Sequence, residues 1–453
     1  MVAGCELRPQ GARWLGAGVP ETLIPSDTED IEPAFHLLSR AAWGPWPGDV
    51  EHVRSVGPDA WIASQLRPDK LDDSACLAMS RRFESVVAPV GEAWEYRQAV
   101  LTEELARHTF LRALTSKRQL QEVMVGFWSD HFNIQMAKGD CVYAKPSDDR
   151  EVIRRHALGS FRDLLRASAL SPAMLVYLDG VENKRGVPNE NYARELLELH
   201  TLGVDGGYSQ ADVMEAARCL TGWRVRGLEE WRRGRVEFHP DRHDDGVKMV
   251  LGSVIAGRGA AEIDDLIDVV AAHPSTARFL ATKLCRWFIA DDPPAAAIAV
   301  VADTFTTSEG DVPATLRAVF STPEFWASAG GKLKRPFRFV VSSMRGLGGL
   351  TDGGPEVLDW LGRMGQAPFQ HPTPDGYPFE ARPWLGTLLW RWSFARQIDD
   401  LAHIPWQDFD LDAHGLFRHL VGRRGTASER AVLVGDLAAV APLILSSPAF
   451  QRH

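Results

Sequence analysis

The stretch Pro188-Asn189-Glu190-Asn191-Tyr192-Ala193-Arg194-Glu195-Leu196-Leu197-Glu198-Leu199-His200-Thr201-Leu202-Gly203 has the spacing of a helix with one polar and one apolar side. At about 100° per residue, four polar side chains share one arc: Asn191, Arg194, Glu195 and Glu198. Apolar side chains fall roughly opposite and are expected to pack inward: Tyr192, Ala193, Leu196, Leu197 and Leu199. Gly203 suits the C-terminal end of the helix. The pattern therefore predicts a packed helix over 188–203.

The polar side of this helix has two interpretations. Glu195 and Glu198 are three residues apart, so their carboxylates are expected to lie side by side, and Arg194 is four residues from both Glu190 and Glu198. In the first interpretation the face is solvated and held by helical ion pairs. In the second it lines a cleft, where the two carboxylates bind a metal or transfer protons.

Composition and charge limit the classes of protein to consider. The chain has 453 residues, is 45% apolar and has a net charge of −10, which argues against a dedicated nucleic-acid binder. No segment approaches the roughly 18 consecutive apolar residues of a transmembrane helix. Five scattered cysteines form no CxxC pair, so neither a disulfide framework nor a zinc knuckle is predicted.

The N-terminal sequence bears on localisation. It shows no basic segment followed by an apolar one, so no signal peptide is visible and a cytoplasmic protein is expected. Val2-Ala3-Gly4-Cys5 resembles the end of a lipoprotein cleavage box. A trimmed or misassigned N-terminus would make the protein an exported one.

The rest of the chain predicts a mainly α, multi-helix body. We expect an extended arm over 1–30, a helical core domain over 31–380 and a C-terminal helical subdomain over 381–453, packed on the core. Residues 224–260 predict a small β-hairpin insertion. Ser209 and Asp212 fit a capping box that begins a helix, and Ser171 followed by Pro172 marks the start of another.

Two further clusters carry residues suited to chemistry. His131 lies between aromatic residues in Trp128-Ser129-Asp130-His131-Phe132-Asn133, where a packed, hydrogen-bonded histidine is the simpler interpretation. The segment 238–246 contains His239, His243 and Asp244, which can close on a divalent metal or form an ordinary polar turn. Together with Glu195 and Glu198 these side chains form a mixed nitrogen and oxygen set suited to Fe, Mn or Zn.

Several segments together resemble a bacterial family known as domain-of-unknown-function family 1800. The matching pieces are His36-Leu37-Leu38-Ser39-Arg40 with Gly44-Pro45, Trp128 to Phe132, His156 to Gly159, Pro172 to Asp179, Pro188 to Trp223, His243-Asp244, His273 to Ala277, Pro323-Glu324-Phe325 and Gly365-Gln366. The resemblance covers roughly residues 31–378 and implies a mostly helical fold. It implies no reaction.

The leading functional hypothesis is a metal-dependent enzyme, either an oxidoreductase or a hydrolase. Its metal ligands would be Glu195, Glu198, His239, His243 and Asp244; its catalytic residues would be Glu195, His131 as ligand or general base, Arg194 to fix the carboxylates or an anionic substrate group, and Asn191 on the same polar arc. The alternative is a non-catalytic binding or scaffold protein, in which the polar helix is an internal ion-pair network. A small-molecule or saccharide-like substrate and a protein partner both stay open.

Overall fold

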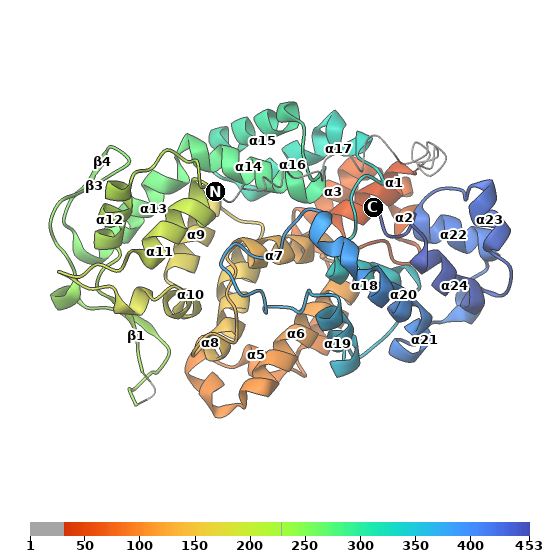
Figure 1. Ribbon diagram of the computed structural model, residues 1–453, viewed down its shortest axis with the longest axis horizontal. Coiled ribbons are helices and arrows are strands. Elements are labelled where there is room, and N and C mark those ends of the chain that lie inside the picture. The colour runs from red at the N-terminus through yellow and green to blue at the C-terminus, as the bar shows by residue number, and fades with distance from the viewer. Residues whose placement is uncertain (1–30, 228) are drawn as a thin grey trace, which may run out of the picture.

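The computed structural model describes residues 31–227 and 229–453 (Figure 1). The described chain is mainly helical, with two small antiparallel two-stranded sheets. This confirms the predicted mainly α fold with a small β insertion. The expected N-terminal arm, residues 1–30, lies outside the described residues.

The helices follow one another along the chain with short connections. The first part contributes α1 (Pro33–Ala41), α2 (Asp49–Val56), α3 (Pro58–Gln65), α4 (Ser74–Ser80), α5 (Glu84–Val87), α6 (Gln98–Thr115), α7 (Gln119–His131) and α8 (Cys141–Asp148). Next come α9 (Phe161–Ala169), α10 (Pro172–Tyr177), α11 (Glu190–Glu195), α12 (Gln210–Cys219) and α13 (Glu262–Ala271). The third part contains α14 (Pro274–Phe288), α15 (Ala295–Thr307), α16 (Val312–Ser321), α17 (Pro323–Ala327), α18 (Pro336–Gly346) and α19 (Pro355–Arg363). The last part contains α20 (Leu388–Arg396), α21 (Ile398–Leu401), α22 (Ala413–Val421), α23 (Ala427–Val432) and α24 (Leu437–Ser446).

Short 3₁₀ helices connect several of these elements: η4 (Pro68–Lys70), η5 (Val90–Glu95), η7 (Gly180–Glu182), η9 (Pro240–Arg242), η10 (Gly259–Ala261), η11 (Arg382–Thr387) and η12 (Trp406–Asp408). Within the described residues, no helix combines the length and the apolar character needed to cross a bilayer.

Helix α7 lies near the centre of the view in Figure 1, with α14 to α17 above it and α20 to α24 at the right. Apolar side chains cover most of its circumference, which is typical of a helix buried inside a protein: Leu120, Val123, Met124, Val125, Phe127 and Trp128. Asp130 and His131, at its C-terminal end, are buried as well. Buried polar groups need partners inside the protein, so the end of α7 is where polar chemistry collects.

The segment predicted as one helix over 188–203 contains a change of helix type. α11 is an α-helix whose N-terminal Asn189 side chain accepts a hydrogen bond from the backbone N–H of Asn191 at 2.9 Å. It is followed by a π-helix, η8 (Leu196–Thr201), in which the N–H of Leu202 bonds to the carbonyl of Leu197 at 2.8 Å. Four side chains of this π-helix are buried: Leu196, Leu197, His200 and Thr201. A second π-helix, η6 (Asp149–Arg154), follows α8.

The β insertion consists of two hairpins. β1 (Trp223–Val225) pairs with β2 (Val236–Phe238), and β3 (Lys248–Val250) pairs with β4 (Ser253–Ile255), both antiparallel. Two local predictions of helix starts also hold. Ser209 and Asp212 form the capping box of α12, and Pro172 stands in the first turn of α10.

The C-terminal helices contact the rest of the chain through α18. Phe339 of α18 packs against Phe394 of α20 and against Phe450, with ring centres 5.6 and 6.0 Å apart. Leu333 and Arg452 form an isolated β-bridge. The predicted division of the chain near residue 380 stays a prediction.

Candidate functional site

A lysine and a histidine meet inside the protein where α14 approaches the end of α7. Lys283 Nζ lies 2.9 Å from His131 Nδ1, and His131 Nε2 lies 3.1 Å from the backbone carbonyl of His200 in η8. A carbonyl oxygen only accepts, so Nε2 carries the hydrogen and Nδ1 accepts from the lysine amine. Burial, reinforced by the nearby Lys283, holds the pKa of His131 well below its usual range. His131 is therefore a neutral acceptor for the amine.

The amine of Lys283 lies among aromatic rings and away from direct anionic partners. Its Nζ is 5.4 Å from the ring centre of Phe279 and 5.6 Å from that of Phe379. In the described chain it forms no ion pair. Burial lowers the pKa of Lys283 to about 8, and the more distant carboxylates of Asp130 and Asp375 partly oppose that shift. A lysine in such surroundings is a stronger candidate for chemistry than an ordinary surface lysine.

Three carboxylates, those of Glu195, Glu198 and Asp375, lie close enough for their charges to interact, and Asp375 also acts on Lys283. Glu195 is half-buried, and burial together with the charges of Glu198 and Asp375 raises the pKa of its carboxyl group. The hydroxyl of Tyr208 donates to Glu198 at 3.3 Å. Glu195 has no hydrogen-bond or ion-pair partner among the residues that the structure describes. Its crowded carboxylate is thus available to a cation, a proton or a substrate.

Asp375 is supplied by the segment 367–380, which is fastened to the end of α7. Asn133 donates to the carbonyls of His371 and Thr373, at 3.1 and 2.7 Å. Gly376 has φ +76°, and a Cβ atom there would lie 2.1 Å from the carbonyl oxygen of Asp130. Only glycine fits so close to the backbone of α7, so this contact fixes where Asp375 stands.

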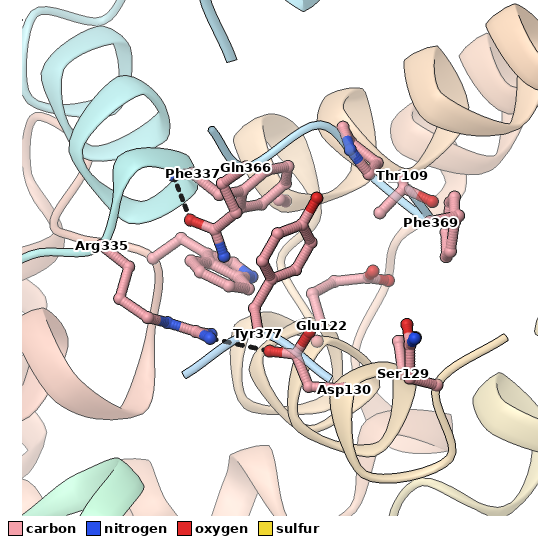
Figure 2. A pocket seen from close by; sticks show the side chains of 14 residues that line it. Thr109, Glu122, Ser129, Asp130, Arg335, Phe337, Gln366, Phe369 and Tyr377 are labelled. Atoms are coloured by element: carbon pink, nitrogen blue, oxygen red, sulfur yellow. Dashed lines mark hydrogen bonds and ion pairs between the residues drawn. The ribbon is translucent and has the colours of Figure 1, made fainter. Parts of the chain in front are cut away.

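A cavity of about 70 Å³ lies beside the same end of α7 (Figure 2). Arg335 donates to Asp130 at 2.7 Å on one side of it, and Gln366 and Tyr377 line another. Burial raises the pKa of Asp130, against the opposing charges of Arg335 and Lys283. The cavity has room for several water molecules or a small ligand group, and Asp130 is the residue that it shares with the surroundings of Lys283.

Two of the predicted catalytic residues serve as structural links. Arg194 forms hydrogen bonds with Glu190 and Gln210, at 2.9 and 2.8 Å. The amide of Asn191 donates to the carbonyl of Leu178 at 3.2 Å and to the side chain of Asp179 at 3.0 Å. Both side chains tie α11 to its neighbours.

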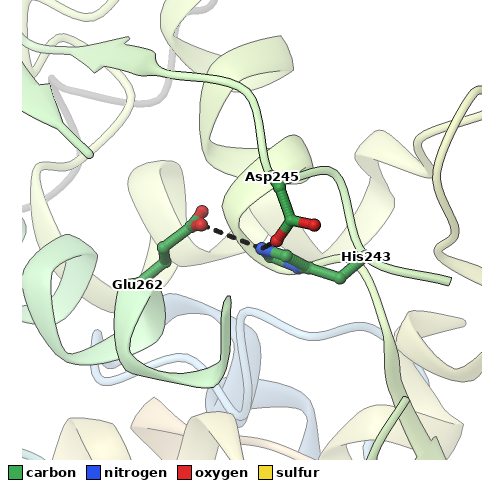
Figure 3. Close-up of side chains that lie close together, drawn as sticks. All are labelled: His243, Asp245 and Glu262. Carbon is green, nitrogen blue, oxygen red and sulfur yellow. Dashed lines mark hydrogen bonds and ion pairs between the residues drawn. The ribbon is translucent and has the colours of Figure 1, made fainter. Parts of the chain in front are cut away.

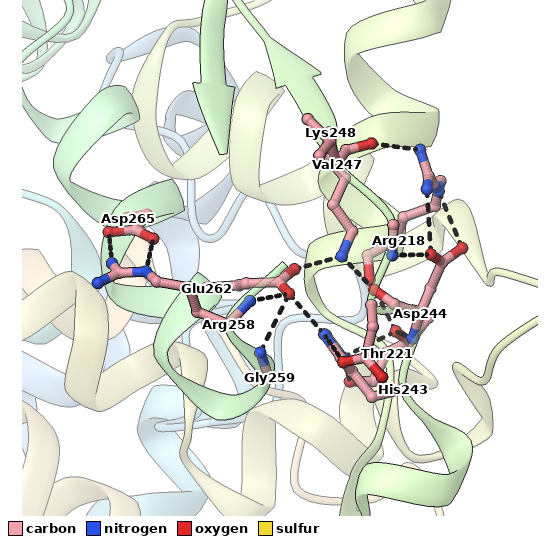
Figure 4. Close-up of polar contacts among 12 residues, drawn as sticks. Arg218, Thr221, His243, Asp244, Val247, Lys248, Arg258, Gly259, Glu262 and Asp265 are labelled. Carbon is pink, nitrogen blue, oxygen red and sulfur yellow. Dashed lines mark hydrogen bonds and ion pairs between the residues drawn. The ribbon is translucent and has the colours of Figure 1, made fainter. Parts of the chain in front are cut away.

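The predicted ligands in the loop after β2 lie in a different network, beside α13. His239 Nε2 lies 2.7 Å from a carboxylate oxygen of Glu237. Arg218 donates two hydrogen bonds to Asp244, at 2.9 and 3.0 Å (Figure 4). Arg218 lowers the pKa of Asp244 to about 2. The structure therefore brings Glu195 and Glu198 together and, separately, His243 and Asp244.

His243 takes part in the one group of metal-type ligands found in the described residues. Its ring, Asp245 and Glu262 offer ligand atoms within 4.8 Å of one another (Figure 3). His243 Nδ1 lies 2.8 Å from the carbonyl of Thr221, and Nε2 lies 2.9 Å from Glu262. The buried ammonium of Lys248 also bonds to Glu262 (Figure 4). A divalent ion here would have to displace a lysine that already supplies the positive charge.

The sequence interpretation missed Lys283 and Asp375. Lys283 stands on α14 between Phe279, four residues before it, and Trp287, four residues after it. A lysine flanked by aromatic residues on the adjacent turns is a usable signal, because those rings share its helix face. Asp375 lies in a proline-rich segment with no periodic pattern, so nothing local marked it.

The protein is thus mainly helical, with a buried polar centre at the end of α7. The family model described as "Protein of unknown function (DUF1800)" matches residues 36–452, nearly the whole chain, and the chain belongs to that family. The resemblance seen in the sequence is thereby confirmed. No curated protein and no solved structure matches the chain.

Proposed function

We propose that this protein is an enzyme whose proton-transfer centre is Lys283 with its partner His131. One observation carries the proposal: the amine lies 2.9 Å from a neutral, buried imidazole, among aromatic rings and without an ion pair in the described chain. At pH 7 an amine with a pKa of about 8 is neutral in roughly one molecule in ten, far more than an ordinary lysine. It can then remove a proton from a substrate or attack it.

Glu195 supplies the complementary group in this proposal. Its raised pKa makes this carboxyl group easier to protonate than that of an ordinary glutamate, and Asp375 stands near both Glu195 and Lys283. A base and an acid that both reached one substrate would serve a hydrolase or an oxidoreductase equally well. His131, predicted as ligand or base, here holds and polarises the amine.

A bound divalent metal, Fe, Mn or Zn, is a second proposal for the same place. It is supported by the crowding of Glu195 with Glu198 and Asp375, because a cation between carboxylates removes their mutual repulsion. Glu195 and Glu198 would be its ligands. The metal would polarise a substrate oxygen or a water molecule.

A non-catalytic scaffold remains the alternative, and the Glu190–Arg194 pair favours it for that part of α11. A scaffold would use Glu195 and Lys283 only for stability. The two functions therefore predict different results for a folded variant without the Lys283 amine: an enzyme would lose its activity, whereas a scaffold would have none to lose.

The enzyme proposal is tested by incubating the protein with a bacterial metabolite extract and following all components by mass spectrometry. We expect some components to be consumed and others formed by the wild type and by Lys70→Met, an exposed lysine with 77% of its side chain accessible. Lys283→Met should leave the extract unchanged, although its circular dichroism spectrum shows that it is folded. Equal turnover by Lys283→Met, or none by the wild type with and without added metals, would contradict the proposal.

The metal proposal is tested by elemental analysis of protein purified without chelator. We expect near-stoichiometric Fe, Mn or Zn in the wild type and its loss in Glu195→Gln/Glu198→Gln. The matched control is Glu92→Gln/Glu95→Gln, two exposed glutamates with the same spacing. Metal-free wild type after reconstitution would rule out the metal and leave the lysine proposal standing.

A further inference from the structure

A second buried lysine, far along the chain from Lys283, lacks any neutralising partner. Lys334 precedes α18 and is 5% exposed. Its Nζ lies 3.4 Å from the ring centre of Phe450. Within residues 31–227 and 229–453 its amine makes no hydrogen bond and no ion pair. A buried ammonium without a partner is strongly disfavoured, so the surroundings of this group need an explanation.

The charged groups nearest to Lys334 are also cations. Burial, together with Arg338 and Arg391, holds the pKa of Lys334 well below its usual range. Arg338 donates to the carbonyls of Ser39 and Ala42, at 2.6 and 2.5 Å. In the described chain no carboxylate pairs with Lys334, Arg338 or Arg391. Any positive charge on Lys334 is therefore not balanced by an ion pair with a carboxylate of the described chain.

A small cavity of about 10 Å³ adjoins these cations. Lys334, Arg338 and Phe450 line it, together with Ser39 and Ser342. Its volume corresponds to about one water-sized body. The carbonyl of Ser39 already accepts from Arg338 and from His453 Nδ1, whereas the hydroxyl of Ser39 has no partner in the described residues. The groups left free to bind an occupant, the amine of Lys334 and the hydroxyl of Ser39, can both donate a hydrogen bond.

We propose that this cavity is a binding site for one monovalent anion of chloride size, held by the ammonium of Lys334 and the hydroxyl of Ser39. An anion matches donors in a cationic surrounding, where a metal ion would be repelled. Since Ser39 belongs to α1 and Phe450 follows α24, a bound anion joins the two ends of the described chain to the start of α18. The site is independent of the proposed activity.

The first test is thermal unfolding at constant ionic strength while chloride replaces gluconate. A ligand that binds only the folded state stabilises it, so we expect the wild-type Tm to rise by on the order of 2 °C. Lys70→Met should rise equally and Lys334→Met should not respond. A wild type indifferent to chloride, or a Lys334→Met variant that responds as strongly, would overturn the proposal.

The second test does not depend on a variant that folds. Crystals of the wild type grown with bromide in place of chloride should give an anomalous scattering peak next to Lys334 Nζ. A fully occupied water at that position, without anomalous signal, would mean that Lys334 is a neutral amine and that no halide binds.

Discussion

The Lys283 region and the Lys248 region contain the same ingredients, a lysine, a histidine and carboxylates, but connect them differently. Beside α13, Lys248 and His243 both bond to Glu262, so cation, ring and carboxylate satisfy one another. Beside α7, Lys283 bonds only to the histidine, while Glu195 stays unpaired within the described chain. The first arrangement is closed and stabilises the fold. The second keeps bonding capacity, which is what a substrate or a cation requires.

The largest effect is expected from breaking the closed network. Glu262→Gln would leave Lys248 and His243 without their shared anion in a fully buried place, and removal of one partner from a buried pair costs about 3–5 kcal/mol. Chemical denaturation should show a loss of stability of this size. Asp265→Asn, which breaks the more exposed pair with Arg258, should cost at most about 1 kcal/mol. Equal losses in the two variants would mean that the buried network is not the stabilising one.

The lowered pKa of Lys283 should make the stability of the protein depend on pH. The pKa of Lys283 is about 8 in the folded protein, below the ordinary 10.5, so folding carries a cost that is complete below pH 8 and disappears as the pH rises to 10.5. The stability of the wild type relative to Lys283→Met should therefore increase by about 3 kcal/mol between those pH values, at about 1.4 kcal/mol per pKa unit. Urea unfolding at several pH values measures this difference. A difference that stays constant with pH would contradict the lowered pKa, and Lys70→Met serves as the control.

The segment that carries Asp375 gives a test of intermediate size. Gly376→Ala places a Cβ atom against the backbone of Asp130 and also strains a positive φ, so we expect it to be about 1–3 kcal/mol less stable than the wild type. Gly186→Ala is the matched control, since Gly186 has φ +80° and nothing within 4 Å of the added atom. Denaturation midpoints compare them. Should both variants lose the same amount, the close approach to α7 would not matter.

The smallest effect belongs to the polar face of α11. Arg194→Met removes a partly exposed pair with Glu190, and ion pairs near the surface contribute about 0–1 kcal/mol. The unfolding midpoint should therefore hardly move. A loss above about 2 kcal/mol would support the scaffold function, in which this helix holds the protein together.

The sequence predicted the elements that depend on local patterns. The capping box of Ser209 and Asp212, the start of α10 at Pro172 and the β insertion all follow from residues close in the chain, and the structure confirms them. The spacing of Glu195 and Glu198 also predicted that their carboxylates would be neighbours, and the charge of Glu198 does act on Glu195 although a π-helix begins between them.

The candidate site was less predictable because it depends on contacts between distant residues. Lys283 and His131 are 152 positions apart, and no periodicity reports which helices will touch. His243 and Asp244 were predicted as metal ligands or as part of a polar turn, and their partners in the structure, Glu262 and Arg218, lie on the helices α13 and α12. Whether a polar side chain is satisfied or available is decided by the packing of those helices.

The orientation of the His131 ring depends on the number of residues in the π-helix η8, because that helix positions the carbonyl to which the ring is bonded. The acceptor for Nε2 is the backbone carbonyl of residue 200, which any amino acid would supply. Deletion of a single residue from 196–201 would remove the extra residue of this wider turn, so the carbonyl would no longer be held by a π-helix. The carbonyl would leave His131, and the lysine would lose an imidazole of defined tautomer. The backbone geometry of the helix, more than the identity of its side chains, decides that the proton of His131 is on Nε2.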